Sequence, residues 1–598
     1  MQPRRRLNLF AFPPETNALF SMLILASIML ALFSGSVLRL YSGIEDPPAA
    51  VGITSQRLEL TSAFLYITCI SGIAAIGTLG LAVFLFLRYP SQIRRRRKLQ
   101  PLSEKDILVQ EQVNRISSQV GVDPPIVEMP MQGLKGSDAQ AFGFGKQQTI
   151  ALDGGFRILR KTRPEIFNAL LRHELAHFAN ADIGRSYFSD ALWKSIRWLL
   201  VFPFLFALAA IVIQGFLMGI FGDGQLELAI ASIPGVLGVF LQWGLVLTIA
   251  GLIWARLLRT REFYADWRAA LWGSENGLQE ILREEAGKRS SKTRIGLWKF
   301  HPEAKERLEA LERPEILFQL SLTILFLAGL LLAFIFAGLY FSFAAFITFA
   351  EAILLLRDSA SGLLYWILTA LWWGGFAFLI LLLFGLTGGL VNAVLLPQVQ
   401  KQTILDLLNK QSQWQQYGKM LLASFILVIG IEFGFFMIPF SQLAPNDLLG
   451  ILIEFFIILP VLTCLAWWYL IYLKFVSARL LITQTGKDLS VWRSRFLSMA
   501  SSVWIFFFFI PGILLTRFLD VSFREVFAYL STGWLIFALL LSPLVFGVTW
   551  ALIELFFKNQ SRNCPHCGTI TRQQEPALGL CEHCGGVLGE WLFISKQS

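Results

Sequence analysis

The chain has 598 residues, of which 55% are hydrophobic, 14% aromatic and only 15% charged. A soluble globular protein of this size needs more charge on its surface, and a disordered protein needs low hydrophobicity, so both classes are excluded. The 51 basic and 41 acidic residues give a formal net charge of +10. In a membrane protein such an excess is typical of basic cytoplasmic loops, and we favour this interpretation over nucleic-acid binding.

Apolar runs of about 20 residues, the length needed to cross a bilayer, recur along the chain. The first could be the apolar part of a signal peptide, but its length favours a membrane anchor. The runs predict about ten transmembrane helices, at roughly 17–38, 62–87, 197–221, 228–257, 316–340, 362–390, 420–441, 448–473, 497–516 and 528–556.

Basic clusters flank the first two runs, with Arg4–Arg6 before the first and Arg94–Lys98 after the second. The positive-inside rule places both clusters in the cytoplasm, and ten crossings return the C-terminus to the same side. We expect a plasma membrane of the bacterial type. The long polar segments then all face the cytoplasm, namely 88–196, 258–315 and 557–598.

The first polar segment contains a motif typical of a zinc site. Pro164 to about Tyr187 is predicted to be a helix, and it contains His173, Glu174 and His177. Residues four apart share a helix face, so both imidazoles can reach one ion. Glu174 is then placed to accept a proton from zinc-activated water. Because the chain has only five histidines, two helix histidines in this pattern by chance are improbable.

The second polar segment offers the missing third ligand. Glu262 and Asp266 lie four residues apart on a probable helix that leaves the fourth apolar run. Glu262 can complete a site with two His and one Glu, and Asp266 can hydrogen-bond a ligand imidazole. Without the upstream motif, these residues would be read as a helix of alternating surface charges.

These motifs in this order resemble the HtpX and CAAX-prenyl-protease family of membrane zinc metallopeptidases. The resemblance includes Asp182 after the first motif, a membrane hairpin, and Arg261 to Asp266, and it extends from about residue 100 to 315. It implies that Glu174 acts as general base and then acid, and that Asp266 supports a ligand. It also implies the zinc ligands, namely His173, His177 and Glu262.

A His-Pro segment downstream adds to the resemblance, and Arg307 follows His301 at a similar spacing. His301 and Arg307 are therefore candidate catalytic residues. His301 could stabilise an oxyanion or bind substrate. It could equally be an ordinary residue at the start of a helix, before Pro302.

A strand pair is predicted between residues 137 and 153, with glycines in the turn. Members of the family carry Asn-Ala-Phe on an edge strand, and Gln140 here replaces the Asn. A substrate peptide could still add to the backbone of this edge. The residues of the predicted substrate strand are Ala139, Gln140, Ala141 and Phe142.

The C-terminal segment contains two Cys-x-x-Cys pairs, each followed by glycine. Two matched pairs are typical of one structural zinc in a small ribbon, and redox pairs are the weaker alternative. The C-terminal segment has too few basic residues to favour nucleic-acid binding. The predicted ligands of this second zinc are Cys564, Cys567, Cys581 and Cys584.

The fold class expected is mainly α: a polytopic membrane protein with a cytoplasmic α+β zincin domain and a small zinc ribbon. Glu432 and Glu454 fall inside predicted spans, where a carboxylate is costly and suggests function. The predicted regions are a two-span segment 1–98, a peptidase domain 99–315 interrupted by a hairpin 197–257, a membrane region 316–556 and the ribbon 557–598.

The function expected is hydrolysis of peptide bonds at the cytoplasmic membrane face, with protein or peptide substrates that include membrane proteins, as in quality control. One alternative is the processing of lipidated peptides. Another is a transporter or scaffold with a regulatory zinc domain. The cofactors expected are two zinc ions, one catalytic and one structural.

Overall fold

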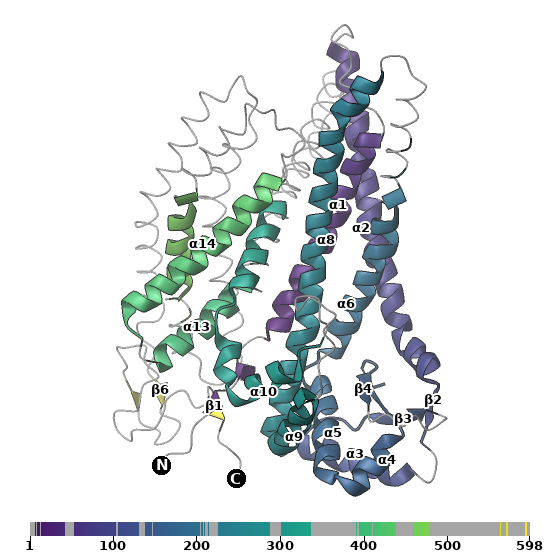
Figure 1. The fold of residues 1–598 in the computed structure, drawn as a ribbon, viewed down its shortest axis with the longest axis vertical. Helices are drawn as coiled ribbons and strands as arrows, with labels where there is room; N and C mark the ends of the chain where they lie inside the picture. Colours follow the sequence, from purple (N-terminus) through teal and green to yellow (C-terminus); the bar gives the residue numbers. More distant parts are fainter. Residues whose placement is uncertain are drawn as a thin grey trace, which may run out of the picture.

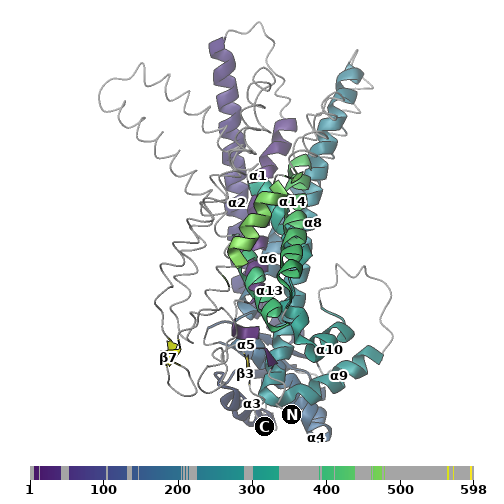
Figure 2. The same cartoon turned by 90° about the vertical axis from the view of Figure 1, so that its left-hand side faces the viewer.

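Long helices occupy one end of the molecule, and a small sheet with short helices gathers at the other (Figures 1 and 2). For the helical stretches at 32–41, 53–71 and 225–240, the backbone alone is described. Apart from isolated positions, the computed structural model describes residues 6–11, 14–41, 53–102, 106–130, 138–203, 225–287, 301–335, 394–437, 459–477, 562–563, 570–571 and 593–594.

Among these residues, four helical stretches are long and apolar enough to cross a membrane. They are Gly72–Arg97, Trp243–Gly287, Pro314–Ile335 and Gln413–Gly434. The length and apolar composition of these helices identify the chain as an integral membrane protein. The predicted runs at 497–516 and 528–556 lie outside the described residues, as does all of 362–390 except Leu390.

Five predicted spans, at 17–38, 62–87, 228–257, 316–340 and 420–441, overlap helices of the described residues. The predicted spans at 197–221 and 448–473 are described only in part. The fifth run differs at its start, where Pro314–Phe318 forms a 3-10 turn (η6) before a helix over 322–335. The other long helices are α1 (Glu15–Tyr41), α2 (Ile53–Arg97), α8 (Gln225–Ala269) and α14 (Gln413–Met437).

Two glycines allow close packing between residues 322–335 and α14. A Cβ added at Gly329 would meet the carbonyl oxygen of Leu427 at 2.1 Å, and one at Gly430 would meet that of Phe326 at 2.3 Å. Small residues at such crossings let helix backbones approach in a membrane. These glycines let the helix at 322–335 and α14 approach each other closely.

The sheet at the other end has four strands in the order β2-β3-β5-β4. β3 and β5 pair in parallel, and the other neighbours pair antiparallel. This confirms the predicted strand pair and places β4 at an edge. The strands are β2 (Leu99–Pro101), β3 (Ile126–Pro130), β4 (Ala139–Phe142) and β5 (Thr149–Leu152).

Short helices pack against this sheet around a core that includes Phe142, Phe156 and Phe167. They are α3 (Ile107–Val120), α4 (Gly155–Thr162), α5 (Pro164–Ala179) and α6 (Ile183–Ile196). Past α8, a π-helical turn leads to α9 (Glu275–Gly287), and α10 (Ala304–Glu312) packs on it.

The prediction of one helix from Pro164 to about Tyr187 is wrong. α5 ends at Ala179 and α6 begins at Ile183, because Ala181 adopts a left-handed conformation with φ of 51°. A non-glycine residue in this region interrupts a right-handed helix. The break lets the chain turn at Asp182.

The two ends of the chain are joined by a short antiparallel pair. β1 (Arg6–Leu7) pairs with β8 (Phe593–Ile594), at the same end of the molecule as the sheet (Figure 1). Another pair, β6 (Arg562–Asn563) and β7 (Ile570–Thr571), flanks the first Cys-x-x-Cys in sequence. All four predicted cysteine ligands lie outside the described residues.

Candidate active site

Helix α5 supplies two buried imidazoles. Pro164 occupies its first turn, where a missing N–H costs nothing, and Glu165 adds a favourable charge at the positive end of the helix. His173 and His177 follow on the face turned toward α8, and both are buried. Their ring centroids are 4.9 Å apart, so both rings border the same small space.

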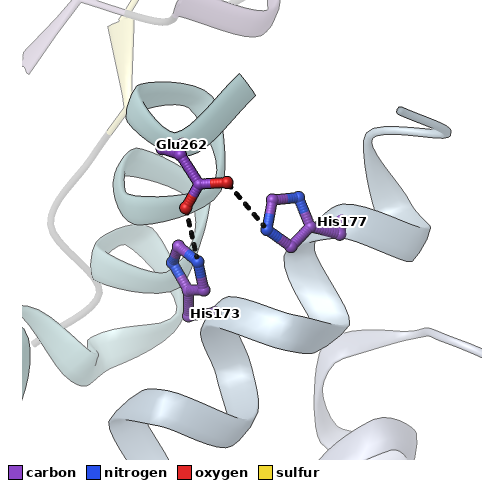
Figure 3. A group of neighbouring side chains, drawn as sticks. All are labelled: His173, His177 and Glu262. Carbon is purple, nitrogen blue, oxygen red and sulfur yellow. Dashed lines mark ion pairs between the residues drawn. The ribbon is translucent and has the colours of Figure 1, made fainter. Parts of the chain in front are cut away.

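Helix α8 brings Glu262 to these imidazoles from a distant part of the sequence (Figure 3). One carboxylate oxygen lies 3.4 Å from Nε2 of His173, and the other lies 3.9 Å from Nε2 of His177. One ligand atom from each of the three residues lies within 4.8 Å of the others. All three side chains are buried, so the arrangement is an interior cluster of donors rather than a surface cluster.

Each imidazole has its other nitrogen beside a second carboxylate. Nδ1 of His173 lies 2.9 Å from Asp266, one helical turn after Glu262. Nδ1 of His177 lies 3.0 Å from Asp182, which the break between α5 and α6 presents. A carboxylate at Nδ1 fixes the proton there and leaves Nε2 free to bind a metal.

Two arginines balance the buried carboxylates. Arg307 on α10 donates two hydrogen bonds of 2.6 Å to the two oxygens of Asp266. Burial alone lowers the pKa of Arg307, but this ion pair outweighs it, so the pKa is raised and the guanidinium stays charged. Arg261 donates to an oxygen of Glu262 at 2.9 Å. The bidentate pair between Arg307 and Asp266 fixes orientation as well as charge.

The donor set fits zinc. Burial alone lowers the pKa of His173, but hydrogen bonds to Asp266 and Glu262 outweigh it and raise the pKa to about 10. In the protein alone, a proton on His173 therefore holds the positive charge that these carboxylates require. Two imidazoles and one carboxylate with an open fourth position are the ligand set of catalytic zinc. His173, His177 and Glu262 form that site, as the sequence predicted.

Glu174 sits beside the first ligand and contacts the edge strand. Its Oε2 accepts a hydrogen bond of 2.6 Å from the backbone N–H of Ala141 on β4. The carbonyl of the same Ala141 accepts a hydrogen bond of 2.6 Å from the hydroxyl of Tyr187 on α6. The predicted general base and the predicted substrate strand are therefore in direct contact.

The other predicted residues of the edge strand have different surroundings. The side chain of Gln140 accepts a hydrogen bond of 3.2 Å from Arg97 at the end of α2. Phe142 is fully buried in the core of the sheet, and Ala139 is partly buried. Gly143 has φ of 92°, and a Cβ there would meet the carbonyl oxygen of Gln147 at 2.0 Å, so this glycine forms the turn after β4.

His301 is exposed and lies directly before α10, and among the described residues no hydrogen bond or ion pair joins it to the zinc ligands. Glu432 is buried within α14, whereas Glu454 lies outside the described residues.

Residues 103–315 match the family model described as "Peptidase family M48". This part of the chain is an M48 peptidase domain. No curated protein and no solved structure matches the chain. The family match and the buried His-His-Glu site together identify a zinc metallopeptidase, a hydrolase that acts on peptide bonds.

Two residues that contact the M48 site have no role predicted from the sequence. The motif includes Asp182, but its contact with His177 depends on the helix break. The sequence predicts Tyr187 only as the end of a helix. No local signal distinguishes these two residues, because each acts through a contact between separate elements.

Proposed function

We propose that the protein is a membrane-embedded zinc endopeptidase that cleaves peptide segments at the cytoplasmic face, next to the bilayer. The observation that carries the proposal is the continuity of α8. One helix contains the apolar residues up to Leu258 and the zinc ligand Glu262. At about 1.5 Å per residue, Glu262 lies only about 6 Å further along the axis than Leu258.

The orientation rests on the basic end of α2. Arg94 to Arg97 end this helix, and basic residues mark the cytoplasmic side of a span. Arg94 donates to Glu128 on β3 at 2.9 Å, and Arg97 donates to Asp153 after β5 at 2.6 Å. The same basic turn that faces the cytoplasm therefore contacts the sheet of the peptidase domain.

The chemistry follows from the placement of the side chains. A zinc ion held by His173, His177 and Glu262 would supply Lewis acidity to the scissile carbonyl and to water. Glu174 takes the proton from the attacking water and passes it to the leaving amine. Asp266 and Asp182 keep each imidazole oriented, and Arg307 holds Asp266 in place. His301 is our candidate for a contact with the developing oxyanion.

Substrates of such a site are membrane proteins and polypeptide segments that emerge from the membrane, as in quality control of membrane proteins. A ligand helix that continues from the membrane favours them, because the scissile bond has to reach within one or two helical turns of the apolar zone. The C-terminal cysteines would hold a second, structural zinc in a ribbon.

The test is a trapping experiment with the full chain. Glu174→Gln should keep the metal but lose peptide cleavage, so that bound substrates accumulate and can be identified by mass spectrometry. Glu165→Gln is a matched control, because Glu165 lies on the same helix but is exposed at its start. Full cleavage by the Glu174→Gln variant would contradict the proposal.

A further inference from the structure

The edge of strand β4 has a defined set of outward backbone groups. Gln140 pairs with Ala151 and Phe142 with Thr149, and the N–H of Asp153 donates to the carbonyl of Asp138. In an antiparallel ladder, alternate residues bond to the neighbour and the others point away from it. The N–H and C=O of Ala141 therefore point away from β5.

These outward groups of Ala141 are already occupied. The N–H donates to Glu174, and the C=O accepts from Tyr187, both at 2.6 Å. A peptide that adds to a sheet edge uses the N–H and C=O of one residue as a pair. At the position nearest the general base, the protein's own side chains therefore take both bonds that a substrate strand would make.

Packing fixes the position of Tyr187 beside the carbonyl of Ala141. Its side chain is buried, and its ring stacks on Tyr89 of α2 with centroids 4.1 Å apart and planes at 26°. Burial also raises the pKa of Tyr187, so the hydroxyl remains a donor across the physiological pH range. An incoming substrate N–H therefore competes with this hydroxyl for the carbonyl oxygen of Ala141.

We propose that Tyr187 is a specificity-determining residue that competes with the substrate backbone for the carbonyl of Ala141. This inference rests on the proposed function. Substrates that bind well present an extended segment with a free backbone N–H opposite Ala141, because that donor replaces the tyrosine hydroxyl. A proline or an N-methylated residue at this position has no N–H and leaves the Tyr187 bond in place.

The selectivity has a physical reason. Exchange of one hydrogen bond for another leaves the carbonyl satisfied, whereas a peptide without the donor gains nothing at this position. The competition therefore favours extended, unfolded segments over folded loops, whose N–H groups are already bonded. A peptidase beside a membrane would in this way spare folded domains.

The experiment measures binding of three zinc-directed probes to the purified full chain. The first is a peptide hydroxamate with all its backbone N–H groups. The second is the same peptide N-methylated at one residue at a time, and the third is acetohydroxamate, which is too small to reach the edge. Tyr187→Phe is compared with the wild type and with Tyr89→Phe, which removes a hydroxyl from the stacked partner ring.

In the Tyr187→Phe variant, the first probe should bind about tenfold tighter, the equivalent of one hydrogen bond no longer displaced. For a peptide substrate, KM should fall with a smaller change in kcat. N-methylation at one position should abolish the gain, and acetohydroxamate should bind as in the wild type. Tyr89→Phe should change none of these values.

Unchanged or weaker binding of the first probe to Tyr187→Phe overturns the proposal, as does a fall in kcat with KM unchanged. If Tyr187→Phe no longer binds acetohydroxamate, Tyr187→Met repeats the test. Loss of acetohydroxamate binding in both variants shows that an intact zinc site needs the Tyr187 hydroxyl. This result also overturns the proposal. If the wild type binds all probes but cleaves no peptide, the proposed function fails, while the competition is still read from the binding data.

Discussion

The two zinc-ligand histidines are oriented by carboxylates of different origin. Asp266 comes from α8, the helix that also provides Glu262, and Asp182 comes from the turn directly after α5. Asp266 is further anchored by Arg307, whereas the Asp182 contact depends on the local break at Ala181. The two imidazoles are therefore supported by independent parts of the fold.

Replacement of Asp182 by Asn should weaken zinc binding by about 10- to 100-fold, because the carboxylate no longer holds the proton and orientation of His177. Competition with a fluorescent zinc chelator would measure this loss. Asp190→Asn is the control, since Asp190 lies on α6 but pairs with Lys194 away from the metal. Equal zinc affinity in the wild type and the Asp182→Asn variant would contradict a positioning role.

Zinc binding should depend on pH through His173, whose pKa is raised to about 10 in the metal-free protein. Because the pKa is raised above its unfolded value, protonated His173 stabilises the metal-free fold below about pH 6.5, and this contribution is lost as pH rises toward 10. The metal needs the neutral imidazole, so zinc affinity should rise by about tenfold per pH unit over the same range.

Calorimetry in buffers of different ionisation enthalpy would measure this exchange, with uptake of about one proton by the buffer per zinc bound near neutral pH. The same titration after Asp266→Asn should release fewer protons, since the main hydrogen-bond partner that raises this pKa is gone. Zinc affinity independent of pH between 7 and 9 would show that His173 is neutral in the free protein.

At the scale of elements, α8 connects the zinc site with the C-terminal membrane region. Glu262 and Asp266 face α5, whereas Tyr264 lies about 200° around the helix from Glu262, at about 100° per residue. The hydroxyl of Tyr264 accepts a hydrogen bond of 3.1 Å from Lys401, a fully buried residue of α13 (Leu396–Leu408). Ile404 of α13 packs in the same apolar cluster as Tyr264.

This contact predicts coupling between α13 and the ligand helix. Lys401→Met and Tyr264→Phe should each lower the apparent melting temperature in detergent. Converted to free energy of unfolding, the loss in the double variant should be about 1 kcal/mol smaller than the sum of the two single losses. Lys419→Met combined with Tyr264→Phe should be additive, because Lys419 of α14 pairs instead with Asp406. Strict additivity of the first pair would indicate that the hydrogen bond contributes no stability.

Some elements could be predicted from sequence because their signals are local. Periodicity and length identified the long helices, and the spacing of His173, His177 and Glu262 identified the zinc site. The end of α5 could not be predicted, since a left-handed Ala181 has no composition signal. The contacts of Ala141 could not be predicted either, because they join residues 33 and 46 positions apart.

At the scale of the molecule, the zinc content should reflect two separate sites. The full chain should bind about two zinc ions, His177→Ala about one, and Cys581→Ser about one with peptide cleavage retained. Elemental analysis by mass spectrometry, normalised to protein, measures the ratio. A single zinc in the wild type that Cys581→Ser leaves unchanged would contradict the predicted ribbon.

The pairing of β1 with β8 sets an order of events during biosynthesis. Arg6 and Leu7 leave the ribosome more than 580 residues before Phe593 and Ile594. β1 therefore has no partner until β8 has been translated, after the four described membrane helices have been made. A product whose translation stops before Phe593 lacks this pair.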